Sequence, residues 1–215
     1  GMNRRQAGED FYFLQELAKT GGVDQIFTTT VRPSSRGSHR VPFGTGQRIR
    51  RHLDGGEDEY RLYDPRSYDI LRAWLGLVAT HLADDGQVLM DRAGAIAPAL
   101  RAYLELAGFA ETWEGLRRNA PGPEQLLHQF HRWMDSFRTM KLIHFLRDNG
   151  YPECGMFEAL HNLLARLGKP WPFPGPEAMR NNIAAQQVLL DYLREMAGLR
   201  QNIGEAAGHV DPMGL

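Results

Sequence analysis

Cysteine is almost absent from this chain: Cys154 is the single one in 215 residues. One thiol excludes an intramolecular disulfide framework and a zinc site with several cysteine ligands. Covalent haem attachment is excluded as well, since the Cys-x-x-Cys-His motif is missing. So little cysteine is typical of proteins that work in a reducing compartment, and we expect a cytoplasmic location.

Long apolar runs and an excess of basic charge are also missing. The most hydrophobic stretch, residues 73–83, is interrupted by Thr80 and His81 and falls short of the roughly 20 apolar residues of a membrane span. The first residues contain no apolar run of the kind that secretory signals carry. The chain has 25 basic and 26 acidic side chains, whereas nucleic-acid-binding domains usually carry a basic excess. We therefore expect no membrane partner and no nucleic-acid partner.

The length and composition that remain fit one globular domain over residues 1–215. Hydrophobic residues make up 42% of the chain and charged residues 24%, close to the averages of globular domains. Residues 23–64 form an irregular segment rich in arginine and glycine, in which a β-branched run at 26–31 predicts a strand. The Gly-rich residues 201–215 are expected to form a loose tail.

Apolar residues recur at helical spacing over most of the other residues. The pattern predicts helices over 9–20, 65–83, 95–107, 123–148, 153–167 and 177–199. Asp64 and Pro65 suit the N-cap and first position of the second of these helices, and residues 87–90 read as a short strand or a connector. The predicted fold class is mainly α: a single-domain helical bundle over 65–200 with an irregular, partly β N-terminal segment.

Side chains with metal-ligand chemistry share one face of the predicted 123–148 helix. Spacings of four, three and four place them in one arc: Glu124, His128, His131 and Asp135. The helix over 153–167 adds Glu158 and His161, the Glu-x-x-His arrangement by which carboxylate-bridged di-iron bundles hold each metal. An antiparallel hairpin would let His128, His131, Glu158 and His161 ligate iron, with Asp135 orienting an imidazole. The same spacing also fits a solvated face stabilised by charge pairs.

His144 has different neighbours on the same predicted helix. Trp133, Phe137 and Met140 precede it at steps of four, three and four, so the pattern places His144 on an apolar face. An imidazole between apolar walls suits the axial ligand of a haem. The alternative is a core histidine that donates to a backbone carbonyl.

The N-terminal segment concentrates basic charge. Residues 25–53 contain no acidic residue and six arginines: Arg32, Arg36, Arg40, Arg48, Arg50 and Arg51. Guanidinium groups bind carboxylates and phosphates through paired hydrogen bonds. We therefore predict that Arg36, Arg40 and Arg48 bind an anionic substrate and that Arg40 acts with Asp135 in catalysis.

Two functions from different classes follow from these features. The first is a cytoplasmic metal- or haem-dependent enzyme, oxidative in its chemistry, that uses iron or haem on a small anionic or aromatic molecule. The second is a non-catalytic helical module that associates with another protein or with itself, through exposed aromatic residues such as Trp171 and Phe173 in a proline-rich linker.

Overall fold

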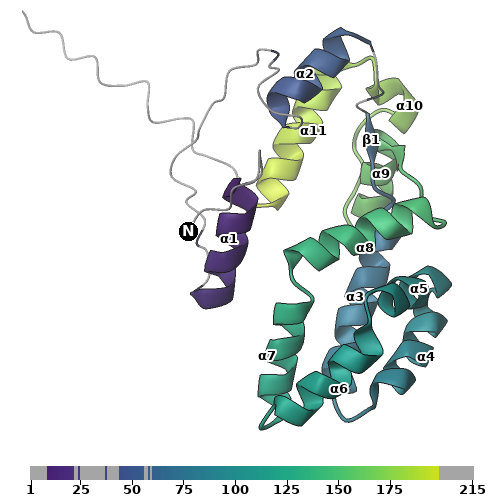
Figure 1. The fold of residues 1–215 in the computed structure, drawn as a ribbon. Coiled ribbons are helices and arrows are strands. Elements are labelled where there is room, and N and C mark those ends of the chain that lie inside the picture. Colours follow the sequence, from purple (N-terminus) through teal and green to yellow (C-terminus); the bar gives the residue numbers. More distant parts are fainter. Residues whose placement is uncertain are drawn as a thin grey trace, which may run out of the picture.

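A computed structural model describes residues 9–21, 24, 37, 44–55, 58 and 60–198. Within them the chain forms eleven helices and one two-stranded sheet, as Figure 1 shows. The helices are α1 (Glu9–Thr20), α2 (Thr45–Leu53), α3 (Pro65–Thr80), α4 (Gly86–Ile96), α5 (Pro98–Leu106), α6 (Phe109–Asn119), α7 (Pro123–Trp133), α8 (Ser136–Asp148), α9 (Met156–Arg166), α10 (Pro176–Met179) and α11 (Ile183–Met196). The strands β1 (Arg61–Leu62) and β2 (Cys154–Gly155) pair antiparallel. The predicted mainly α fold class is confirmed.

A cluster of aromatic rings forms the centre of the larger core, which joins helices α3 to α8. Trp74, Phe109, Trp113 and Phe130 are all fully buried. Trp74 and Phe109 meet edge to face with ring centroids 4.9 Å apart, and Trp113 and Phe130 do so at 6.1 Å. Such pairs add to the stabilisation that burial alone provides. This cluster holds α3 against α6 and α7.

A smaller core joins α9, α10 and α11. Phe157, Met179 and Leu189 are buried in it. Trp171 and Phe173, which the sequence presents as an exposed patch, instead pack half-buried against this core, and the indole N–H of Trp171 donates to the carbonyl of Pro174 at 2.9 Å. The two side chains are half-buried rather than exposed because the linker folds back on α9, and their predicted role as an anchor for a partner stays a prediction.

Local capping sets where α3 and α4 begin. The carboxylate of Asp64 accepts the backbone N–H of Arg66 at 2.8 Å, so Asp64 is the N-cap of α3 as predicted. Asp85 caps α4 in the same way, through the N–H of Val88 at 2.8 Å. Residues 87–90 are therefore helical, and the prediction of a strand or connector is wrong there.

Other element predictions differ from the structure in the middle and C-terminal parts. Helix α6, which the sequence patterns did not indicate, starts after Gly108, whose positive φ of 63° ends α5 in the left-handed region. The predicted 177–199 helix is two helices, α10 and α11, with Asn182 capping the second through the N–H of Ala185. The predicted irregular segment contains α2 and β1, and the predicted strand at 26–31 lies outside the described residues.

Within the described helices, none has the length and apolar composition needed to cross a membrane.

Candidate functional site

The predicted 123–148 helix breaks between Trp133 and Ser136. Met134 is the C-cap of α7, and Asp135 has an extended backbone and is the N-cap of α8. The Asp135 carboxylate accepts the backbone N–H of Arg138 at 3.0 Å. Because Asp135 caps the second helix, it cannot continue the polar face of the first one, and the prediction of one continuous helix is wrong.

Asp135 also holds α1 against the body of the protein. Its second carboxylate oxygen, Oδ2, accepts a hydrogen bond from the side-chain Nε2 of Gln15 at 2.7 Å and lies 3.4 Å from Nζ of Lys19. The ring of Tyr12 packs at a tilt against that of Phe137, with centroids 6.3 Å apart. The contacts of Asp135 are thus those of a helix cap and an anchor for α1, and its predicted part in catalysis stays a prediction.

The two roles of Asp135 can be separated by comparison with Asp85, which caps α4 but has no contact with α1 in the described structure. We expect Asp135→Ala and Asp85→Ala each to lower the free energy of unfolding by about 1 kcal/mol, the usual value of an N-cap. Only Asp135→Ala should also speed hydrogen exchange and proteolysis in α1. Equal protection of α1 in both variants would contradict the anchoring role of Asp135.

The predicted iron ligands lie on helices that the structure keeps apart. His128 and His131 are exposed on α7, whereas Glu158 is exposed and His161 half-buried on α9. Figure 1 shows α7 and α9 on different sides of α8. The ring of His161 packs edge-on against Trp171, with centroids 5.3 Å apart. Among the described residues no three His, Cys, Asp or Glu side chains form a group that could hold a metal ion.

His144 and Cys154 occupy partly buried positions. His144, the predicted haem ligand, is half-buried on α8, and its ring lies 5.8 Å from that of Tyr63 between centroids. Burial raises the pKa of the Cys154 thiol, with smaller contributions from the carboxylates of Asp64 and Glu158. A raised pKa leaves less of the reactive thiolate, so the environment of Cys154 is that of a structural thiol rather than a nucleophile.

The predicted anion-binding arginines are only partly within the described structure. Arg36 and Arg40 lie outside the described residues. Arg48 lies exposed on α2. The predicted arginine clamp and the catalytic role of Arg40 therefore stay predictions.

The structure instead brings together an apolar groove between α3 and α9, which we call the α3–α9 groove. Its volume is about 710 Å³. Ten residues line it: Leu62, Pro65, Tyr68, Asp69, Arg72, Ala159, Leu160, Leu163, Arg166 and Leu167. Tyr68 is 51% exposed and Leu167 54% exposed, although both side chains are large and largely apolar. The groove thus leaves apolar surface open to solvent.

A small charge cluster crosses the same groove. The Asp69 carboxylate forms an ion pair with Arg166 of α9 and lies 3.8 Å from the guanidinium of Arg72. Burial raises the pKa of the Tyr68 phenol, with a smaller contribution from Tyr63, so this phenol carries no charge at neutral pH. Two guanidinium groups and one carboxylate leave the lining of the groove with a net positive charge.

The packing of α9 explains why leucines face this groove. Phe157 and Leu164 point into the protein and are buried. Leu160, Leu163 and Leu167 follow at steps of three and four, so they share a neighbouring face of the helix and line the groove. Leu160 also lines a second groove, of about 320 Å³, between α9 and α11. The apolar lining therefore continues across α9.

Sequence reasoning missed these residues because a leucine at helical spacing normally indicates core. The available signal was the width of the apolar stripe on α9, in which Phe157, Leu160, Leu163, Leu164 and Leu167 cover more of the helix than one packing face needs.

Comparisons with protein-family models, with curated proteins and with solved structures found no match.

Proposed function

We propose that this chain is a non-catalytic helical binding module whose α3–α9 groove receives an amphipathic, negatively charged partner segment. The observation that carries the proposal is that exposed apolar side chains and a net positive charge lie in the same groove. An amphipathic helix that docks between two helices presents apolar anchors at positions i, i+3, i+4 and i+7. The spacing of Leu160, Leu163 and Leu167 is suited to receive such anchors.

The apolar lining supplies the favourable energy of binding. Leu163 is 40% exposed, and Leu167 more so. Covering a leucine completely is worth about 1.5–3 kcal/mol, and these half-exposed side chains retain a fraction of that gain for a partner. Several such side chains together account for a specific contact of moderate strength.

The charge cluster favours partners that carry a negative charge. Arg72 and Arg166 share one carboxylate, and exposed ion pairs of this kind contribute little to stability. A partner carboxylate placed beside them would meet guanidinium charge that Asp69 only partly compensates. Complementary charge of this kind selects partners and speeds their association more than it adds affinity.

The metal- or haem-dependent oxidative enzyme stays a prediction. Its ligands would have to meet in a sheltered place, and the described part of the chain contains no such group of three side chains. The interaction function needs only residues that the structure already brings together.

The dye 8-anilinonaphthalene-1-sulfonate matches this chemistry, because it joins apolar rings to one negative charge. We expect saturable binding with a rise in dye fluorescence, and a loss of about tenfold or more in affinity in Leu163→Glu, which places a carboxylate in the apolar lining. Leu106→Glu is the matched control, since Leu106 is 77% exposed on α5, outside the groove. Equal dye affinity in the two variants would contradict the proposed site.

The positive charge can be tested separately with N-phenyl-1-naphthylamine, which has the same rings without the sulfonate. The wild-type protein should bind the sulfonated dye several-fold more tightly than the neutral one. In Arg166→Gln this preference should shrink, because one of the two guanidinium charges is gone. A preference for the sulfonated dye that is unchanged in Arg166→Gln would contradict the proposal that the charge cluster takes part in binding.

A further inference from the structure

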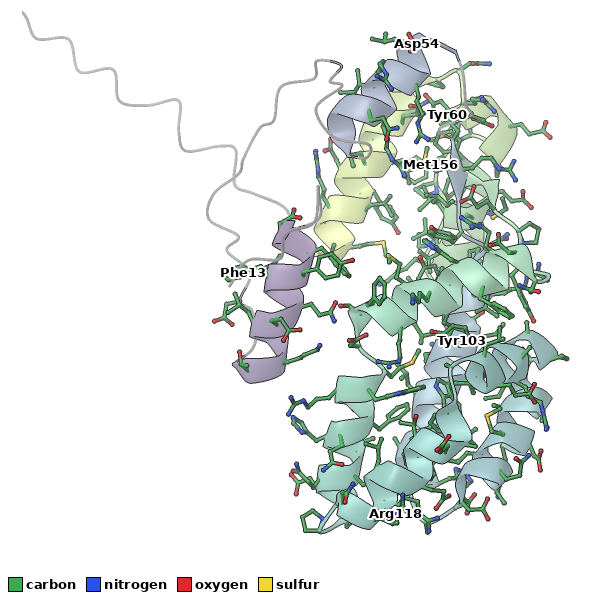
Figure 2. All side chains as sticks on the ribbon, in the orientation of Figure 1. Phe13, Asp54, Tyr60, Tyr103, Arg118 and Met156 are labelled. Atoms are coloured by element: carbon green, nitrogen blue, oxygen red, sulfur yellow. The ribbon has the colours of Figure 1, made fainter. Side chains whose placement is uncertain are left out.

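Helix α1 presents apolar side chains to solvent. Phe13 is 55% exposed and Leu14 47%, and Leu17 is exposed as well. Figure 2 shows Phe13 on the side of α1 that faces away from the other helices. With Asp10, which is also exposed, these residues stand at positions i, i+3, i+4 and i+7, and we call them the outer face of α1.

The opposite side of α1 is the one that its own chain uses. Tyr12, Gln15 and Lys19 face α8, through Phe137 and the Asp135 carboxylate. At 100° per residue these three lie on the reverse of the helix from Leu17. α1 is therefore held by its more polar side and leaves three apolar side chains and one carboxylate outward.

The outer face of α1 and the α3–α9 groove match in length, polarity and charge. Residues 10–17 of α1 and residues 160–167 of α9 each extend about 10 Å, at 1.5 Å per residue. The outer face carries apolar anchors with one negative charge, and the groove offers apolar lining with a net positive charge. Both surfaces belong to one chain, so any solution of this protein contains both.

We propose that the chain associates with itself, the outer face of α1 in one copy docking into the α3–α9 groove of a second copy. This inference rests on the binding function proposed for the groove and names its partner. In each copy Gln15 and Lys19 hold α1 at the start of α8, and Figure 1 shows α1 beyond the left end of α8 and α9 above that helix. The helix that fills a groove therefore comes from another molecule.

Charge fixes the direction of the docked helix. Asp10 lies at the start of α1, and Arg166 is the last residue of α9. Placing the carboxylate of Asp10 beside Arg166 makes α1 run antiparallel to α9. Phe13 and Leu14 then lie over Leu163, and Leu17 lies over Leu160. Antiparallel packing also places opposite ends of the two helix dipoles together.

Sedimentation velocity and light scattering across a range of protein concentrations test this contact. The wild-type protein should reach a mass of two chains or more, against 24.3 kDa for one. Leu14→Glu places a carboxylate on the outer face of α1, and Leu163→Glu places one in the lining of the groove. Each variant should weaken association by about a hundredfold or more, because a carboxylate enters an apolar contact. Leu106→Glu should associate like the wild type.

Mixing the two monomeric variants is the sharpest form of the test. Leu14→Glu retains an intact groove and Leu163→Glu retains an intact α1, so an equimolar mixture should form a two-chain species that neither variant forms alone. Contact between two α1 helices predicts the opposite result, with Leu163→Glu associating normally and no recovery in the mixture. That result would overturn the proposal, as would a wild-type protein that has the mass of one chain at every concentration.

Circular dichroism shows whether each variant keeps its helices. If Leu14→Glu loses helix content, Asp10→Lys takes its place, because it reverses the charge at the end of the outer face without adding charge to the apolar contact.

The dye and the mass measurement separate this inference from the binding function on which it rests. Dye binding that depends on Leu163, together with a monomeric wild-type protein, leaves the groove as a binding site and overturns self-association. If the groove binds the dye and also mediates self-association, the dye should compete with association and lower the measured mass. Association that is insensitive to Leu163→Glu would overturn the inference whatever the dye shows.

Discussion

Gly86→Ala should lower the free energy of unfolding by about 3 kcal/mol, the upper range for overpacking a core position. Gly86 is buried at the start of α4, directly against α6. A Cβ atom there would lie 2.6 Å from the carbonyl oxygen and 2.9 Å from the Cα of Ala110. These are backbone atoms, so α4 and α6 would have to move apart. The N–H of Gly86 also donates to Glu114 Oε1 at 2.7 Å, and this bond would stretch as they separate.

Gly76→Ala is the matched control for this prediction. Gly76 lies on the exposed side of α3, and a Cβ atom added there would meet nothing within 4 Å. Because alanine has a higher helix propensity than glycine, Gly76→Ala should raise the free energy of unfolding by about 0.5–1 kcal/mol. Urea denaturation of both variants measures the difference. Similar effects in the two variants would mean that α4 and α6 do not pack as closely as described.

Trp113→Phe is the second large effect that we expect. The indole N–H of Trp113 donates to the carbonyl of Asp84 at 2.9 Å, which ties α6 to the turn before α4. The smaller ring leaves a cavity in the aromatic core, and the carbonyl loses its donor. A loss of about 2–4 kcal/mol in the free energy of unfolding is expected from the two effects together.

Trp74→Phe separates the cavity from the hydrogen bond. Trp74 is equally buried in the same cluster, but its indole N–H has no hydrogen-bond partner among the described residues. Trp74→Phe therefore makes a similar cavity without breaking a hydrogen bond, and should cost about 1–2 kcal/mol less than Trp113→Phe. A larger loss in Trp74→Phe would show that Trp74 Nε1 has a partner, such as a buried water.

Local signals in the sequence predicted some elements closely. Helix α1 has the predicted bounds, because a short periodic run ends at Thr20. The start of α3 was predictable since Asp64 and Pro65 determine a helix start by themselves. In both cases the decisive interactions lie within a few residues along the chain.

The division of the central helices depended on distant contacts and could not be predicted. Asp135 reads as one more polar residue on a helical face, yet it caps α8 while it binds Gln15 and Lys19, about 120 residues away. The residues on either side of Asp135 favour helix, and one continuous helix satisfies that preference as well as two helices do. The extra contacts made by the break decide between them, and a local pattern does not contain those contacts.

The candidate site was hidden from the sequence for a related reason. Histidines and arginines attract attention because they carry chemistry, whereas Leu163 and Leu167 look like ordinary core residues. Only the placement of α3 beside α9 shows that these leucines line an open groove and that Asp69, Arg72 and Arg166 cluster there. A surface made by two helices far apart in sequence becomes visible only once the helices are placed.

The most direct test of the groove is a map of where an amphipathic anion binds. We would record amide chemical shifts of the labelled protein during titration with 8-anilinonaphthalene-1-sulfonate. We expect the largest changes in residues 68–72 and 160–167, with little change along α7. Changes concentrated on α7, or spread evenly over the described helices, would contradict the α3–α9 groove as the binding site.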